Sequence, residues 1–213
     1  METTASLVGG GDIYAENNAI DYSFSLGICG TYDGSPAFLT CGHDLGPDVS
    51  IYSSASHTTK IGKVAYWNYG YGKTGDYSIV KVTNSNFTTT NKVKGNGTTL
   101  YVNGSVSSPE GTTICKYGKT TGYSSGKVTA TNLTFSNVKG ITQSYIRNSS
   151  KTTPVAGGDS GGSVYVMSGS YCKITGLVSG RPIEPTMTDG YMVMYHTPIL
   201  YAVDNQGFKV KTN

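Results

Sequence analysis

Short apolar runs rich in β-branched and aromatic residues recur along the chain at intervals of roughly ten residues, and glycine-containing turns separate them. Many short strands joined by tight turns build sandwiches or barrels, so this spacing predicts an all-β fold. With 29 Gly and 17 Tyr among 213 residues, the composition disfavours helices and disorder. The expected strands are 24–29, 37–40, 49–52, 61–66, 77–82, 100–102, 112–117, 127–133, 143–146, 163–166, 172–178 and 190–195.

The length suits one large β domain or two small β domains that share a core. The segment 92–103 is polar, glycine-rich and poor in β formers, which marks it as the expected boundary. We therefore predict an N-terminal half, 1–95, and a C-terminal half, 96–213, that form one structural unit. Only the segment 198–205 reads as a helix, with Pro198 in its first turn.

The net charge of +3 comes without a run of consecutive Lys or Arg, so we expect no nucleic-acid partner. No apolar stretch is long enough for a membrane-spanning helix, so we expect no membrane partner. The first residues lack the basic and apolar regions of a signal peptide. From the polar composition we expect a secreted monomer whose leader and any pro-segment are absent from this chain, with neither metal nor cofactor.

The four cysteines are Cys29, Cys41, Cys115 and Cys172, and four cysteines allow three pairings. Cys29 and Cys41 flank the turn 32–36, which favours a disulfide across a hairpin and leaves Cys115 to pair with Cys172. Four buried free thiols are the alternative, because nothing in the sequence establishes an oxidising compartment. A zinc site through Cys41 and His43 lacks two further ligands at metal spacing.

The segment 157–162, Gly-Gly-Asp-Ser-Gly-Gly, is the sharpest local feature. A serine hydroxyl attacks a carbonyl only when a base accepts its proton, and the resulting oxyanion needs preformed donors. Glycines let the backbone aim the N–H groups of Gly158 and Ser160 into one pocket while the Ser160 side chain stays exposed. The same letters also suit a plain glycine-rich turn, so the catalytic hypothesis depends on a base and a carboxylate elsewhere in the chain.

Three histidines can supply that base. His43 directly follows an apolar strand, whereas His57 lies in a polar Ser/Thr loop and His196 reads as a polar residue at a strand end. The base needs a carboxylate that fixes its tautomer and stabilises the imidazolium. Asp76 precedes a strand of buried character and suits this role, whereas Asp44 reads as a turn residue.

Three motifs together resemble the chymotrypsin-like serine proteases, and most of all their secreted bacterial branch, the streptogrisins and α-lytic protease. They are Thr40-Cys-Gly-His43, Asp76-Tyr-Ser-Ile-Val80 and Gly158-Asp-Ser-Gly-Gly162, in the chain order His, Asp, Ser of that family. The stretches 23–27, 114–126, 176–180 and 197–200 also match, so the resemblance covers about residues 8–210.

The resemblance implies two antiparallel six-stranded β-barrels with a cleft between them, a short C-terminal helix, and a cofactor-free serine endopeptidase. It implies His43 as general base and then general acid, Asp76 as its orienting carboxylate and Ser160 as nucleophile, with the amides of Gly158 and Ser160 as the oxyanion hole. Ser179 would support Asp76 and offer its backbone to the substrate. The other implied substrate-binding residues are Pro154, Val155, Ala156, Gly157, Gly180 and Arg181. Implied partners are peptide or protein substrates, a removed pro-segment and protein inhibitors.

The sequence departs from the bacterial branch at two positions. Asp44 and Ser125 stand where that branch has cysteines, so its disulfides do not carry over. Animal members pair a freed N-terminal amine with the Asp before the nucleophile, whereas the bacterial branch uses a basic residue after the strand cysteine. Lys116 stands at that position, so we predict that Lys116 pairs with Asp159, which shapes the serine loop.

Specificity follows from the residues of the pocket. The segment 154–157 holds no carboxylate, which argues against a trypsin-like pocket for Lys or Arg. Arg181 stands where the bacterial branch normally has Gly, so three roles are open: binding an acidic side chain, closing part of the cleft, or a solvated loop arginine. Two other function classes are a non-catalytic protease-like binding or adhesion domain and a structural β-rich surface domain. The first usually lacks a member of the triad, and the second leaves the ordered His and Asp motifs unexplained.

Overall fold

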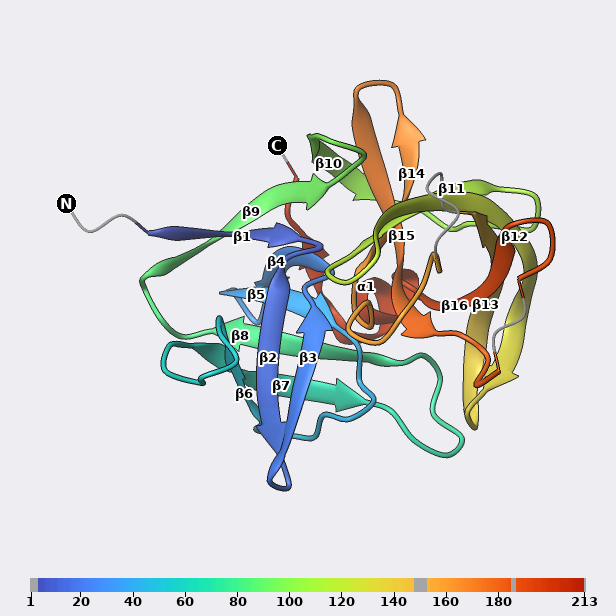
Figure 1. Ribbon diagram of the computed structural model, residues 1–213. Coiled ribbons are helices and arrows are strands. Elements are labelled where there is room, and N and C mark those ends of the chain that lie inside the picture. Colours follow the sequence, from blue (N-terminus) through green and yellow to red (C-terminus); the bar gives the residue numbers. More distant parts are fainter. Residues whose placement is uncertain (1–3, 148–152, 185–186, 213) are drawn as a thin grey trace.

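The computed structural model describes residues 4–147, 153–184 and 187–212, which form two β-sheets and one short helix (Figure 1). The blue and teal strands of the N-terminal half gather on one side of Figure 1, and the yellow and red strands of the C-terminal half on the other. The elements are β1 (Ala5–Gly9), β2 (Asp12–Asn17), β3 (Ile20–Ser25), β4 (Ile28–Tyr32), β5 (Ser35–Thr40), β6 (Ser50–Tyr52), β7 (Lys60–Asn68), β8 (Tyr77–Val82), β9 (Phe87–Lys94), β10 (Thr99–Ser105), β11 (Thr113–Gly118), β12 (Gly122–Phe135), β13 (Val138–Arg147), β14 (Ser163–Ser168), β15 (Tyr171–Gly180), β16 (Tyr191–Pro198), α1 (Leu200–Gln206) and β17 (Lys209–Val210).

Six strands of the C-terminal half form a ring of antiparallel pairs. The ring runs β15–β14–β11–β12–β13–β16, and β16 pairs back onto β15. A closed ring leaves none of these strands as a free edge, which is how small barrels satisfy their backbone groups. Its interior is a buried apolar cluster of Ile114, Val128, Ile146, Val155, Val164, Val178, Met192 and Met194. These pairings are consistent with the expected six-stranded barrel for this half.

The second sheet is antiparallel in the order β17-β4-β5-β8-β7-β6-β2-β3, and a separate buried cluster packs inside it. It differs from the expected six-stranded barrel because it contains eight strands and its order has two ends. Near the β3–β4 corner, Gly10 and Leu26 make backbone hydrogen bonds: Gly10 donates to Leu26 (2.6 Å), and Leu26 donates to Gly11 (2.8 Å). The corner is therefore held by the segment that leads from β1 into β2.

Each sheet also contains strands from the other half of the chain. β1 and β9 extend the sheet that contains the C-terminal ring, and β17 pairs with β4 in the other sheet. The division at residue 95 stays a prediction. The expectation that 92–103 is poor in strand is wrong, because Lys94 and Thr99 close an antiparallel hairpin of β9 and β10. Only alternate strand residues need to be apolar, and Val93 and Val102 supply the buried positions.

The other expected strands each have a counterpart, but the run 24–29 is divided between β3 and β4. Strands β1, β2, β9 and β17 were not expected from the sequence. The helix begins later than predicted, because Pro198 is still the last residue of β16, where it lies opposite Gly176. Gly207, with φ of 69°, ends the helix in the left-handed conformation that glycine adopts readily. Across the described ranges we find no helix of the length and apolarity needed to span a membrane.

The predicted disulfides are wrong, because all four cysteines are buried free thiols. Cys29 lies opposite Phe38 in the β4–β5 pair, and Cys41 is three residues beyond Phe38 along the chain. The two cysteines therefore do not face each other across the hairpin. Cys115 and Cys172 lie on β11 and β15, which β14 separates. Their Cα atoms are therefore two strand spacings apart, each of about 4.8 Å, which together exceed the Cα separation of about 4.4–6.8 Å that a disulfide spans. Burial raises the pKa of Cys29 and of Cys172 to about 12, which keeps both thiols protonated.

Candidate active site

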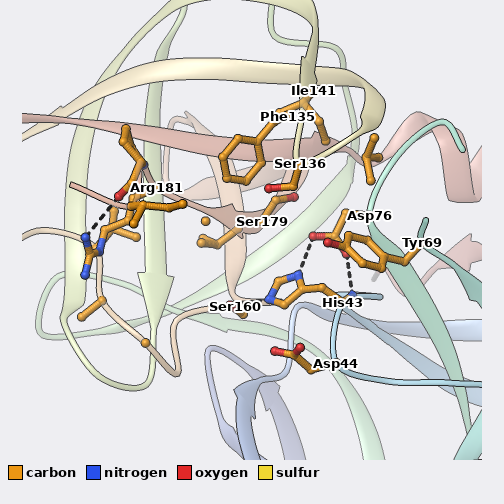
Figure 2. A pocket seen from close by; sticks show the side chains of 18 residues that line it. His43, Asp44, Tyr69, Asp76, Phe135, Ser136, Ile141, Ser160, Ser179 and Arg181 are labelled. Carbon is orange, nitrogen blue, oxygen red and sulfur yellow. Dashed lines mark hydrogen bonds and ion pairs between the residues drawn. The ribbon is translucent and has the colours of Figure 1, made fainter. Parts of the chain in front are cut away.

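A cavity of about 370 Å³ opens where the two sheets meet, and Figure 2 shows the side chains around it. His43 and Asp76 come from the N-terminal sheet, just after β5 and just before β8. Ser160 comes from the loop before β14, and Ser179 from the end of β15. The junction of the sheets thus brings together residues that are more than a hundred positions apart in the sequence.

Three side chains form a continuous hydrogen-bonded chain in this cavity. His43 Nδ1 lies 2.7 Å from Asp76 Oδ2, and His43 Nε2 lies 2.9 Å from Ser160 Oγ (Figure 2). With Nδ1 donating to the carboxylate, Nε2 carries the lone pair and can accept the Ser160 proton. The geometry brings the three predicted residues together in the order that nucleophilic catalysis needs.

The Asp76 carboxylate is buried and fixed by several donors. Its Oδ1 accepts the backbone N–H groups of Gly42 (2.7 Å) and His43 (2.9 Å). Asp76 itself donates its N–H to Thr197 Oγ1 (2.8 Å), and Thr197 Oγ1 bonds Ser179 Oγ (2.9 Å). Ser179 therefore reaches Asp76 through Thr197, a residue that the sequence analysis did not assign to the site.

Two opposing effects set the pKa of His43. Burial lowers it, because a charged imidazolium is poorly solvated there, but the Asp76 carboxylate and its hydrogen bond outweigh burial and hold it well above the usual 6.5. The pH dependence of any base catalysis by His43 follows from this direction. A protonated His43 cannot accept a proton, so activity falls as the pH drops through the raised pKa.

We expect the acidic limb of kcat/KM to have its midpoint above pH 6.5, the ordinary value for histidine. The measurement is kcat/KM on a chromogenic peptide between pH 4 and 9, a range of about five units around that value. A substrate without titratable side chains ensures that the pH dependence does not come from ionisation of the substrate. A midpoint at or below 6.5 would contradict the dominant effect of Asp76.

The backbone around Ser160 leaves two N–H groups unused. Within the described residues the amides of Gly158 and Ser160 donate to no acceptor, whereas Asp159, Gly161 and Gly162 all do. Gly161, with φ of 80°, has no room for a side chain because a Cβ would collide with Thr40. Two free amides beside a nucleophile can bind the oxyanion of a tetrahedral intermediate.

Asp159 anchors this loop from inside the protein. Lys116 Nζ lies 3.2 Å from Asp159 Oδ2, and both side chains are fully buried, which confirms the predicted pair. Asp159 also accepts the N–H groups of Thr120, Thr121 (both 3.0 Å) and Ala156 (3.1 Å). Burial lowers the pKa of Lys116, and the Asp159 carboxylate opposes that effect. Lys116 thus supplies the positive charge that balances the buried carboxylate.

A Lys116→Met variant is expected to lose about 3–5 kcal/mol of unfolding free energy, because it leaves the buried Asp159 charge without its cation. Urea unfolding followed by Trp67 fluorescence measures the loss. Lys63→Met is the matched control, because Lys63 pairs with Asp48 at 2.8 Å on the exposed surface. That variant is expected to change stability by less than about 1 kcal/mol. Equal losses in the two variants would refute a special role for the buried pair.

The pocket walls match most of the predicted set. Val155, Ala156, Gly157, Ser179, Gly180 and Arg181 line the cavity. Pro154 does not; it is buried behind the wall, where its carbonyl accepts Thr121 Oγ1 (3.0 Å) and Ser124 Oγ (3.3 Å). Arg181 Nη1 donates to the Pro182 carbonyl (3.3 Å), and its guanidinium lies across the pocket from His43 (Figure 2).

Sequence reasoning missed two aromatic residues of this cavity. Phe135 comes from the tip of the β12–β13 hairpin, stacks on Tyr195 at 4.1 Å between ring centroids, and covers Gly180, where a Cβ would lie 3.3 Å from its ring. Tyr69 meets the His43 ring edge to face at 5.9 Å. Ser136 and Asn137 both have positive φ, as a two-residue type I′ hairpin turn requires. That turn was the only local signal for the position of Phe135.

The other two histidines lie elsewhere. His57 contacts the Tyr52 ring (4.9 Å) and Asp21 (3.7 Å) on the N-terminal sheet. His196 is fully buried, and burial lowers its pKa to about 3, so it is neutral at ordinary pH. Asp44 lines the cavity in the left-handed conformation, with φ of 63°. His43 is therefore the histidine that reaches both Asp76 and Ser160.

A serine, an imidazole and a buried carboxylate linked in this order, at the junction of two antiparallel sheets, define the class of chymotrypsin-like serine proteases. The comparison with family models agrees with this class. The model described as Trypsin matches residues 36–202, and the chain belongs to the trypsin family.

Solved structures of bacterial proteases share the whole fold. Thermobifida fusca Protease A has a TM-score of 0.76 at 26% identity, over 98% of this chain and 100% of its own. A glutamic acid specific serine protease that uses a histidine triad in substrate binding has a TM-score of 0.76 at 26% identity, over 96% and 100%. Nocardiopsis protease, at 22% identity and a TM-score of 0.75 over 98% and 100%, shows the fold alone. No curated protein sequence matches the chain.

Proposed function

We propose that this trypsin-family chain is a serine endopeptidase whose catalytic residues are His43, Asp76 and Ser160. One observation carries the proposal: the imidazole of His43 bridges Ser160 Oγ (2.9 Å) and Asp76 Oδ2 (2.7 Å). A histidine in contact with both groups can take the hydroxyl proton while the carboxylate stabilises the imidazolium that forms.

The reaction has two matching halves. Ser160 Oγ attacks the peptide carbonyl as its proton moves to His43 Nε2, and the carbonyl oxygen becomes an oxyanion. The free N–H groups of Gly158 and Ser160 are the proposed donors to that oxyanion. His43 then gives the proton to the leaving amine, which leaves an acyl-Ser160 ester. Water attacks the ester in the same way and releases the acid product and free Ser160.

For substrates we propose peptides with an uncharged apolar residue before the scissile bond. Val155, Ala156 and Val178 form an apolar wall, and no carboxylate lies among the residues of 154–157. Arg181 brings a permanent positive charge to the lining, so a glutamate at that position is the alternative. Peptides that differ only in Phe, Leu, Glu or Arg before the scissile bond compare the two. A preference for Glu that Arg181→Gln abolishes would favour the alternative.

Labelling of Ser160 tests the function itself. A peptidyl phosphonate or sulfonyl fluoride is expected to modify one serine, and peptide mapping by mass spectrometry should place the adduct on Ser160. A non-catalytic protease-like binding or adhesion domain would take up no label, although all three triad residues are present. Absence of labelling together with absence of peptide hydrolysis would refute the proposed activity.

The cellular setting belongs to the same proposal. The structural relatives include Thermobifida fusca Protease A, and a polar, charge-poor surface suits a protease released from the cell. We infer that the chain acts as a secreted monomer on peptide or protein substrates. A removed pro-segment and protein inhibitors are proposed as its other partners.

A further inference from the structure

We propose that Thr120, in the turn between β11 and β12, is a positioning residue that orients one donor of the oxyanion hole. The proposal rests on the function above and adds the means by which the Gly158 N–H is aimed. Thr120 Oγ1 donates a hydrogen bond to the Gly157 carbonyl at 2.7 Å. Thr120 does not line the cavity, so its effect on the reaction is indirect.

The geometry of the peptide unit carries the inference. The carbonyl of Gly157 and the N–H of Gly158 belong to one planar trans peptide and point in opposite directions. When Thr120 holds the carbonyl on one side of this plane, the Gly158 N–H must face the other side. That N–H has no acceptor among the described residues, and it is left free for a substrate oxygen.

This peptide plane needs an outside anchor because glycines stand on both sides of it. Gly157 is exposed and has open space where a Cβ would be, and Gly158 adopts φ of 91°. Without side chains, both residues can adopt backbone angles that would turn the plane over. The second donor differs, because the Asp159 carbonyl in the same peptide as the Ser160 N–H is held by a backbone bond from Gly162 (2.9 Å).

The turn that carries Thr120 is itself fixed to the loop it aligns. The N–H groups of Thr120 and Thr121 both bind Asp159 Oδ1 at 3.0 Å, next to the ion pair with Lys116. A Cβ on Gly158 would lie 2.5 Å from Thr120 Oγ1, so the turn packs directly against this residue. The buried ion pair is thereby connected to the oxyanion hole through Thr120.

A second side chain holds the following peptide. Ser25 Oγ donates to the Gly158 carbonyl (2.8 Å) and accepts the N–H of Lys119 (2.9 Å), the neighbour of Thr120 in the turn. This bond directs the Asp159 N–H to the Ala156 carbonyl (3.1 Å), away from the substrate. The turn thus helps to set two consecutive peptide planes, and of these two only the plane held by Thr120 presents a free donor.

The test compares Thr120→Val, which keeps the shape and removes the hydroxyl, with Thr120→Ser, which keeps the hydroxyl. We expect Thr120→Val to lower kcat by about 10- to 100-fold with KM nearly unchanged, since loss of one oxyanion donor costs about 10²–10³. Affinity for a peptidyl boronate, whose adduct places an oxygen in the hole, should weaken by a similar factor. Binding of the acid product peptide should not change, and Thr120→Ser should restore kcat to near the wild-type value.

Thr90→Val is the matched control, because Thr90 Oγ1 also donates to a backbone carbonyl, that of Leu7 (2.6 Å), on the β1–β9 pair. It is expected to keep both kcat and boronate affinity. The inference is overturned if Thr120→Val keeps wild-type kcat, if product and boronate binding weaken equally, or if Thr120→Ser loses as much as Thr120→Val. Should Thr120→Val unfold, Thr120→Ala carries the same expectations. An inactive, unlabelled wild type would instead refute the proposed function.

Discussion

A Ser160→Ala variant is expected to lose about 10⁶-fold in kcat, the size of effect that removing the nucleophile has in comparable triads. The reason is that His43 then has no hydroxyl to activate, and no acyl-enzyme can form. Hydrolysis of a chromogenic peptide, measured with enough enzyme to detect the residual rate, gives the loss. The residual rate comes from the free amides and from substrate binding, which the variant keeps.

The double variant His43→Ala with Ser160→Ala sharpens this expectation. Residues that act as one unit are strongly non-additive, so the double variant should be about as slow as Ser160→Ala alone. Ser56→Ala, in an exposed loop of the N-terminal sheet, is the control for a serine truncation. Activity of Ser160→Ala within tenfold of the wild type, or additive losses, would place the nucleophile at another residue.

Asp76→Asn is expected to lower kcat by about 10⁴-fold while the fold stays intact. An asparagine amide can donate to His43 Nδ1, which shifts the ring proton to Nε2 and leaves no lone pair facing Ser160. The carbonyl oxygen of the introduced amide can still accept the N–H groups of Gly42 and His43, so local structure is retained. Peptide hydrolysis at a pH on the plateau above the acidic limb of the wild-type profile, and the thermal midpoint, together separate loss of chemistry from loss of fold.

The acidic limb of the pH profile of Asp76→Asn provides a second measurement of the role of this carboxylate. Asp76 raises the pKa of His43, so its neutralisation should move the midpoint of residual activity to lower pH. Asp48→Asn, at an exposed carboxylate that pairs with Lys63, is the control and should leave both rate and profile unchanged. A rate loss of tenfold or less in Asp76→Asn would contradict the orienting role of this carboxylate.

The sequence alone was sufficient for most of the strands and for the three central residues. His43, Asp76 and Ser160 each stand next to a strand whose local pattern is clear, and the structure brings them within hydrogen-bonding distance. The resemblance to the secreted bacterial branch also predicted the Lys116–Asp159 pair, because Lys116 stands where that branch has a basic residue after the strand cysteine. These features depend on short motifs of adjacent residues, and such motifs can be recognised in a single sequence.

Features set by long-range contacts were not predictable. The β9–β10 hairpin lies in a polar segment in which Val93 and Val102 are the fully buried apolar side chains. The cysteines were assigned to disulfides from their spacing around a turn, but register and the intervening strand β14 keep them apart. Phe135 reaches the cavity because strand β12 is long enough to carry it there. No local sequence pattern predicts strand register, the order of strands in a sheet or how far a long strand extends.

Residues on either side of the last strand, β17, also bear on the site. Phe208 is fully buried in the cluster shared by the two sheets, and the Lys211 N–H binds the Cys29 carbonyl (3.0 Å). Lys211 Nζ reaches the Thr89 carbonyl (2.8 Å), which belongs to β9. The catalytic groups are contributed by both sheets, so the separation of His43 from Ser160 is a distance between two bodies. The segment 208–211 connects the two sheets and so helps to fix that distance. The alignment of Ser160 with His43 therefore depends partly on residues far from both.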